Sequence, residues 1–134
     1  MDTDWIYKGD SASAMPTFEL TQQVIGCAYN VSNALGCGFL EKVYENALAH
    51  ELRKHGLKVS QQARIRVFYD GVEVGYYDAD IIINDELIVE VKALRSIDDS
   101  HKAQCLNYLK ATGLRLGLLI NFGTSRVDVR RVAL

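Results

Sequence analysis

The chain has 134 residues, of which 49% are hydrophobic and 24% charged, and its formal net charge is −2 at pH 7. These values are typical of one globular domain with a hydrophobic core. The slightly acidic balance excludes a strong positive field that would attract nucleic acid to the whole surface. No apolar run approaches the ~20 residues that a membrane-spanning helix needs, so we expect no membrane association.

The cysteine pattern and the N-terminus indicate a cytoplasmic protein. Cys27, Cys37 and Cys105 are odd in number and widely spaced, without CxxC or Cys/His ligand spacing. This pattern indicates reduced thiols in a reducing compartment and argues against zinc. The first residues lack the basic start and apolar stretch of a signal peptide. Residues 1–16 are interpreted as a polar leader, and residues 17–134 as a single domain.

Two helices are predicted after the leader. Apolar residues recur at helical spacing from Thr17, a suitable N-cap, to about Leu35. The sequence Gly36-Cys37-Gly38 interrupts this helix. A second amphipathic helix is predicted from about Phe39 to His55, followed by a glycine that is suited to end it.

The middle of the chain is predicted to form a three-stranded meander. A strand over 58–69 is followed by Asp70-Gly71, a dipeptide typical of a type I′ turn. The return strand begins at Val72 and leads into a second hairpin over 78–92, whose turn lies at Asn84-Asp85. Most residues of this second hairpin are apolar, as in strands that are buried on both faces.

A strand–helix–strand unit and an edge strand follow the meander. An S-x-x-D capping box at 96–99 is predicted to open a helix that ends near Thr112. The apolar stretch 114–121 predicts a strand parallel to the one before the helix, because the connection is a helical crossover. Residues 126–132 alternate as an edge strand. The fold class is therefore α/β, with a mixed central sheet flanked by helices.

Three charged side chains interrupt the apolar hairpin. Glu90 and Lys92 are two residues apart and leave the same face of their strand, and the turn brings Asp80 opposite or diagonal to Glu90. Like charges across a ladder are destabilising, and charges in a core are usually paired or bind a metal. Two interpretations stay open: a divalent cation bound by the acids, or a salt bridge of Lys92 to both.

Two helices carry further candidate residues. Glu41 lies in the first turn of the second helix, where the helix dipole alone explains an acid. His101, Gln104 and Tyr108 form a single polar and aromatic stripe on the third helix. Taken alone, this stripe indicates only a half-exposed helix edge.

Together these residues resemble a known family. Asp80, followed on the next strand by Glu90-Val-Lys92, is similar to the motif of the PD-(D/E)XK nuclease superfamily. The string Gly38-Phe-Leu-Glu41-Lys-Val-Tyr44 matches the signature of one branch, the GxxExxY proteins. Gln104-Cys-Leu-Asn-Tyr108 resembles the Q-x-x-x-Y motif of RecB-like and λ-exonuclease-like members. The resemblance implies a restriction-endonuclease-like αβββαβ core with an extra N-terminal helix and a C-terminal edge strand.

The chain departs from the GxxExxY pattern at two places. Gly36-Cys37-Gly38 stands where that branch usually has Gly-Pro-Gly, and Ser32 stands where it tends to have a histidine. Both positions bear on whether activity is retained. The carboxylates and the lysine of the motif are all present.

The resemblance implies a metal-dependent phosphodiesterase that acts on nucleic acid, with DNA as the expected substrate. Mg²⁺ or Mn²⁺ would be held by Asp80, Glu90, the backbone carbonyl of Val91 and Glu41, because hard cations prefer oxygen ligands. Lys92 would orient the attacking water or stabilise the charge that develops on the phosphate. The catalytic set is therefore Glu41, Asp80, Glu90 and Lys92.

The resemblance also implies supporting residues and partners. Gln104 and Tyr108 would brace the site or contact the substrate, with Tyr44 and His101 as further supporting candidates. A homodimer or a larger complex is expected. Two alternatives remain: a catalytically silent module that binds nucleic acid or protein on the same fold, and a structural α/β protein whose acids and lysine merely pair.

Overall fold

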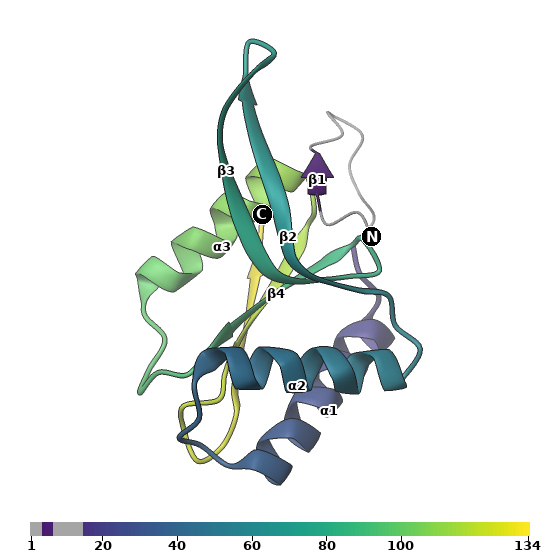
Figure 1. The fold of residues 1–134 in the computed structure, drawn as a ribbon, viewed down its shortest axis with the longest axis vertical. Helices are drawn as coiled ribbons and strands as arrows, with labels where there is room; N and C mark the ends of the chain where they lie inside the picture. Colours follow the sequence, from purple (N-terminus) through teal and green to yellow (C-terminus); the bar gives the residue numbers. More distant parts are fainter. Residues whose placement is uncertain (1–3, 7–14) are drawn as a thin grey trace.

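The computed structural model describes residues 4–6 and 15–134, which form one mixed sheet with helices packed on it (Figure 1). Its elements, in chain order, are β1 (Asp4–Ile6), α1 (Phe18–Leu35), α2 (Glu41–Lys54), β2 (Val59–Tyr69), β3 (Val72–Ile83), β4 (Leu87–Lys92), α3 (Asp99–Thr112), β5 (Leu116–Asn121) and β6 (Asp128–Ala133). The segment from α2 to β5 is the αβββαβ order, with α1 before it and β6 after it. The predicted fold class is confirmed.

The six strands of the described residues lie in sequence order across the sheet. Strands β2, β3 and β4 form the antiparallel meander, β4 and β5 are parallel, and β6 is antiparallel to β5. The predicted parallel pairing across α3 is therefore confirmed. Strand β1 was not predicted; it pairs in parallel with β2 and places Asp4 beside Arg64 in the register.

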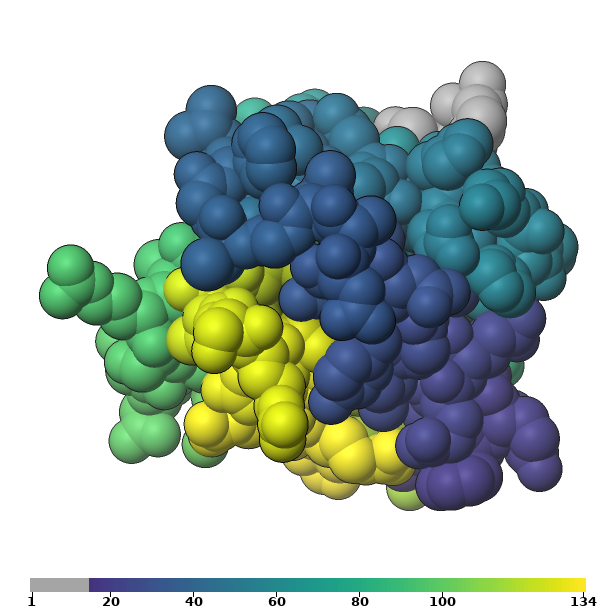
Figure 2. Space-filling model, turned by 90° about the horizontal axis from the view of Figure 1, so that it is seen from below, coloured from purple at the N-terminus to yellow at the C-terminus, as the bar shows by residue number. Residues whose placement is uncertain are grey.

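Two hydrophobic clusters fill the two faces of the sheet. Helices α1 and α2 pack on one face, against alternate residues such as Ile81, Val89 and Leu118. Helix α3 packs on the other face, against Ile82 and Ile88. Seen from below, α1 and α2 lie side by side on their face, and the chain that follows β5 (yellow) lies between them and α3 (Figure 2).

The predicted helix starts differ in one respect from the structure. Thr17 caps α1 as expected, because its Oγ1 accepts the Leu20 N–H. The predicted capping box at 96–99 is wrong: α3 begins at Asp99, and its box is formed by Asp98 and His101. The Asp98 carboxylate accepts the main-chain N–H groups of the first turn, and His101 Nδ1 accepts the Asp98 N–H at 3.0 Å. The pattern from Ser96 to Asp99 overlaps with the pattern from Asp98 to His101, and Asp98 forms the cap.

Strand β3 is shared between two partners of different extent. It pairs with β2 along most of its length, but it pairs with β4 only from Ile81 to Ile83. On the N-terminal side of Ile81, β3 pairs with β2 alone, and the two strands form a hairpin that projects from the body of the molecule (Figure 1). The turn of this hairpin has positive φ angles at Asp70 and Gly71, 52° and 75°, as the predicted type I′ turn requires. Because the pairing of β3 with β4 ends at Ile81, the two strands separate directly beside Asp80.

A buried amide anchors the segment that follows β4. Asn121 at the end of β5 accepts the Leu94 N–H and donates to the Leu94 carbonyl, both at 2.9 Å. The Gly123 N–H also donates to the Asn121 side chain, and a Cβ at Gly123 would collide with the Leu94 backbone. The chain directly after Lys92 is therefore held by β5. None of the described helices is long and apolar enough to cross a bilayer.

Candidate active site

Asp80 and Glu90 form hydrogen bonds between β3 and β4 at the point where the two strands separate. The Asp80 N–H donates to Glu90 Oε2, and the Val91 N–H donates to Asp80 Oδ2, each at 2.8 Å. Each carboxylate thus bonds to the backbone of the opposite strand. The register that pairs Ile81 with Val89 sets Asp80 and Glu90 against each other one position further. The sequence prediction of opposed acids is therefore confirmed.

A third carboxylate comes from α2, and it belongs to Glu45. Glu45 lies on the buried face of this amphipathic helix, with 4% of the residue surface exposed, although its side chain is acidic. Gln62 Nε2 donates to Glu45 Oε1 at 2.8 Å and to Asp80 Oδ1 at 3.3 Å. Gln61 Nε2 and Lys42 Nζ bind Glu45 Oε2 at 2.8 and 3.1 Å. The amide of Gln62 therefore joins the carboxylates of α2 and β3.

Gln62 has an unusual backbone that aims its side chain at the acids. Its φ is +49°, the left-handed region that residues with a Cβ rarely adopt. The pairing of β2 with β3 runs from Gln61–Ile81 to Ala63–Ala79 and skips Gln62. Gln62 lies opposite Asp80 without a change of register, and residues with a strained backbone commonly cluster at functional sites.

The carboxylates are held in an environment that disfavours their charge. Burial is the main cause that raises the pKa of Asp80, and the nearby charge of Glu45 adds to it. Burial, reinforced by the charge of Asp80, raises the pKa of Glu90 to about 8. The hydrogen bond from the Asp80 N–H and the charge of Lys92 oppose this rise. Nearby cations thus compensate the buried acids only in part.

The structure brings three more of the predicted residues to the acids. The Lys92 ammonium follows Glu90 on β4 and donates to Gln104 Oε1 of α3 at 3.4 Å. Tyr108 is buried one turn further along α3, with its ring 5.3 Å from that of Tyr77 on β3. Burial raises the pKa of Tyr108, with further contributions from the charges of Glu90 and Asp80. Helix α3 therefore forms one wall of the site.

Three predicted site residues lie elsewhere. Glu41 is exposed in the first turn of α2, and within the described residues no contact joins it to Asp80 or Glu90. Tyr44 is fully buried: its hydroxyl donates to the Gly36 carbonyl at 2.6 Å, and its ring stacks on Phe122 at 4.8 Å. His101 caps α3 instead of joining the acids.

Glu45 and Gln62 were missed because sequence reasoning followed the signature. Glu41 and Glu45 are four residues apart and share one helix face, so periodicity does not separate them. The one available signal was that Glu45 directly follows Tyr44, a core residue of that helix. Gln62 gave no signal, because a left-handed residue inside a strand has no sequence mark unless it is glycine.

The donor set fits a hard divalent cation. Carboxylates of Asp80, Glu90 and Glu45 lie around Gln62 and the Asp80 N–H, although within the described residues their oxygens do not all lie within 4.8 Å of one another. Mg²⁺ and Mn²⁺ prefer such oxygen ligands. The Gln62 amide nitrogen now lies between two of these oxygens, where a cation would replace it. The carboxylates thus supply negative charge, and the position of the Gln62 nitrogen is one that a cation could occupy.

Comparison with known proteins identifies the class. The family model described as "PD-(D/E)XK nuclease superfamily" matches residues 18–132. The chain therefore belongs to the PD-(D/E)XK nuclease superfamily, as its sequence resemblance predicted. No curated protein sequence matches the chain significantly.

One solved structure supports the fold. The protein titled "Crystal structure of SSO0001" superposes with a TM-score of 0.52 at 21% sequence identity. The match covers 86% of this chain and 57% of that protein, so this chain spans little more than half of its length. At this identity the likeness shows a shared fold and nothing about activity.

Proposed function

We propose that this protein is a divalent-metal-dependent nuclease that hydrolyses phosphodiester bonds in nucleic acid, with DNA as the expected substrate. The observation that carries the proposal is the set of opposed carboxylates of Asp80 and Glu90. Glu90 and the neighbouring Glu45 are buried and Asp80 is half-buried; the pKa values of Asp80 and Glu90 are raised, and one lysine is adjacent. Buried like charges are costly unless a cation binds them or a proton neutralises one of them. A structural salt bridge alone leaves this cost largely uncompensated.

Each residue of the site has a proposed role. Asp80, Glu90 and the Val91 carbonyl hold Mg²⁺ or Mn²⁺, and Glu45 supplies the third carboxylate in place of Glu41. The bound cation would neutralise the phosphate and lower the pKa of a bound water. Glu41, one turn away on the same helix face, would act through water.

The remaining groups act on the substrate and on the water. Lys92 orients the attacking water and stabilises the negative charge that develops on the phosphate. Gln104 holds the Lys92 ammonium, and Tyr108 braces the wall of α3. Tyr44 and His101 support the site from a distance, through the loop at Gly36 and through the start of α3.

A finer placement within the superfamily is also proposed. The string from Gly38 to Tyr44 supports membership of the GxxExxY branch, and the Gln104 to Tyr108 spacing supports the RecB-like motif set. A net charge of −2 provides no general attraction for nucleic acid. A homodimer or a larger complex would add substrate contacts to those of one chain.

A cleavage assay with a paired variant tests the proposal. Circular and linear DNA, single- and double-stranded, and RNA are incubated with the parent and with Asp80→Asn in Mg²⁺ or Mn²⁺. We expect cleavage by the parent and a loss on the order of 10²–10³-fold or more in the variant, because the variant loses electrostatic stabilisation of the transition state. Comparing circular with linear substrates distinguishes internal from terminal cleavage.

The other outcomes are equally informative. Equal cleavage by both proteins would place the activity outside this site. Mn²⁺ binding that depends on Asp80, without cleavage of any substrate, would favour a nuclease that needs a missing partner. Absence of both binding and cleavage would favour the catalytically silent module on the same fold.

A further inference from the structure

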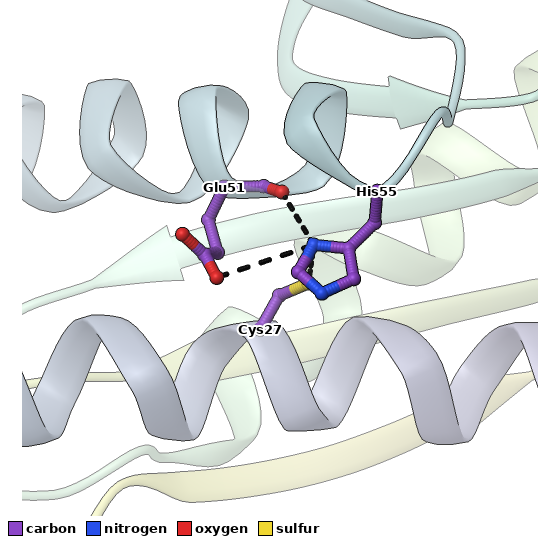
Figure 3. A group of neighbouring side chains, drawn as sticks. All are labelled: Cys27, Glu51 and His55. Atoms are coloured by element: carbon purple, nitrogen blue, oxygen red, sulfur yellow. Dashed lines mark hydrogen bonds and ion pairs between the residues drawn. The ribbon is translucent and has the colours of Figure 1, made fainter.

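A second group of potential metal ligands lies at the C-terminal end of α2 (Figure 3). It consists of Cys27 on α1 and of Glu51 and His55 on and just after α2. One ligand atom from each residue lies within 4.8 Å of the other two. This is the one group of three or more histidine, cysteine and acidic residues that meets this distance within the described part of the chain.

The packing of α1 against α2 creates this group. Glu51 and His55 are four residues apart, which places them on one face at the end of α2. Cys27 faces them from α1, and two neighbours on the same stripe of α1 bond across the interface. Gln23 Nε2 donates to the His55 carbonyl at 3.4 Å, and Asn30 Nδ2 donates to Glu51 Oε2 at 3.1 Å. The group is therefore braced from both sides.

The distances suit a tetrahedral ion. Cys27 Sγ lies 3.6 Å from His55 Nδ1. A tetrahedral Zn²⁺ with Zn–S of about 2.3 Å and Zn–N of about 2.0–2.1 Å places these two atoms about 3.6 Å apart. Glu51 Oε2 lies 4.0 Å from the same nitrogen, so metal binding would require this carboxylate to move closer to it.

The burial of the three residues leaves one side open. Cys27 is 1% exposed and lies at the bottom of the group. The side chain of Glu51 is 16% exposed and that of His55 is 40% exposed, so both reach solvent. An ion held by these three ligands would therefore keep a fourth position for water. Zinc accepts such mixed sulfur, nitrogen and oxygen sets, whereas Mg²⁺ prefers oxygen alone.

A thiol-based activity is the main competing interpretation, and the environment opposes it. Burial, reinforced by the charge of Glu51, raises the pKa of the Cys27 thiol. Reactive cysteines have lowered pKa values, usually next to positive charge. The imidazole gives Cys27 no help as a base, because its nearest nitrogen already bonds to the Glu51 carbonyl at 2.9 Å.

We propose that Cys27, Glu51 and His55 bind Zn²⁺, with water as the fourth ligand, and that the ion joins α1 to the end of α2. Binding releases one proton, from the Cys27 thiol, as the Zn–S bond forms. The imidazole stays neutral: its proton moves from Nδ1 to Nε2, and the hydrogen bond to the Glu51 carbonyl gives way to a Zn–N bond. Widely spaced cysteines argue against zinc in sequence, but here helix packing joins ligands 28 residues apart.

This inference does not rest on the proposed nuclease activity. The two sites use different ligand atoms and favour different ions, so either one can fail alone. The zinc site would act on α2, which also carries Glu45. Glu45 and Glu51 are six positions apart, which corresponds to about 9 Å along the helix axis. Fixing this end of α2 would therefore limit the movement of the third carboxylate.

A cobalt titration tests the site. Co²⁺ replaces Zn²⁺ in tetrahedral sites, and a thiolate ligand gives it a charge-transfer absorption band. The protein is titrated under reducing conditions, followed by competition with Zn²⁺. We expect one equivalent of Co²⁺ to produce the band, Zn²⁺ to abolish it, and Zn²⁺ to raise the melting temperature by several degrees.

Matched variants identify the ligands. Cys27→Ser should abolish the band, whereas Cys37→Ser, which alters an exposed cysteine, should retain it. His55→Ala changes a largely exposed side chain, so the fold should survive while the affinity falls by more than an order of magnitude. Asp80→Asn should leave the band unchanged. A band that persists in Cys27→Ser, or the absence of a band in the folded parent, would overturn the proposal.

Discussion

The two ends of α2 carry two acidic groups that differ in chemistry. Near its start, Glu45 meets Asp80 and Glu90, and the ligand atoms are all oxygen. At its end, Glu51 meets a thiol and an imidazole. The first group is suited to a hard cation and the second to a softer one. One helix thus positions two sites that different metal ions would distinguish.

The groups also differ in how their charges are satisfied without metal. Glu51 bonds to Asn30 and to Lys54, at 3.1 and 3.2 Å, and these bonds lower its pKa. The pKa of Glu90 is instead raised to about 8, because burial and Asp80 outweigh its hydrogen bond. A carboxylate with a lowered pKa is stable as it stands, whereas one with a raised pKa is stabilised by protonation or by a cation. The oxygen-only site therefore has more to gain from metal.

The largest effect on cleavage should come from neutralising single acids of α2. Glu45→Gln should lower cleavage and Mn²⁺ affinity by about 10²-fold, because a buried charge beside the reacting phosphate is lost. Glu41→Gln should change both by less than about threefold, since an exposed acid acting through water contributes little. Glu51→Gln is the matched control at the other end: it should weaken Co²⁺ binding, and in zinc-free buffer it should leave cleavage unchanged. A larger loss in Glu41→Gln than in Glu45→Gln would restore the signature residue as the third ligand.

This pair of acids also illustrates what the sequence could predict. Helices, strands and the opposition of Asp80 to Glu90 follow from periodicity and turn chemistry, which are local properties. The choice between Glu41 and Glu45 depends on how far α2 reaches over β3, which is a tertiary property. Both acids lie on one helix face, so the signature decided the prediction in favour of Glu41.

The features that escaped prediction depend on distant packing. Strand β1 has three residues, and its partner Arg64 lies about half the chain away. Cys27 and His55 meet only because α1 packs on α2. The left-handed backbone of Gln62 accompanies a side chain that binds two carboxylates from other elements. Such contacts override local propensity and leave no pattern along the chain.

The pH dependence of stability should separate the two groups. The pKa of Glu90 is raised from 4.5 to about 8 on folding, so between these values the folded state binds more protons than the unfolded state. Without metal, stability should therefore fall as pH rises from about 4.5 to 8, and the raised pKa of Asp80 acts in the same direction. Glu90→Gln should flatten this dependence and raise the melting temperature at pH 8 by several degrees.

The thiol of the second group should contribute nothing in this range. Its pKa is raised from 9.0, so the stability change linked to Cys27 lies at higher pH. Thermal melts in a chelating buffer from pH 4 to pH 9 measure the effect, with Cys27→Ser as the control that should keep the parental slope. Added Mn²⁺ should restore stability at pH 8. A melting temperature that rises from pH 5 to pH 8 without metal would contradict the raised pKa of Glu90.

The smallest effect concerns the amide that stands between the carboxylates. Gln62→Gly should be more stable than Gln62→Ala by about 1 kcal/mol, because only glycine adopts positive φ without steric cost. Both variants lose the hydrogen bonds to Glu45 and Asp80, so their difference isolates the backbone. Chemical denaturation of the two variants measures it.

The same variants also test whether the amide occupies the place of a cation. If the ion replaces the Gln62 nitrogen, the metal-free state loses those hydrogen bonds in Gln62→Ala and the metal-bound state loses nothing. Mn²⁺ should then bind about tenfold more tightly to Gln62→Ala, since a hydrogen bond to a charged group contributes roughly 1.5–3 kcal/mol. Weaker binding would instead mean that Gln62 positions the carboxylates around the ion. The Co²⁺ site at Cys27 should respond to neither variant, because it shares no side chain with Gln62.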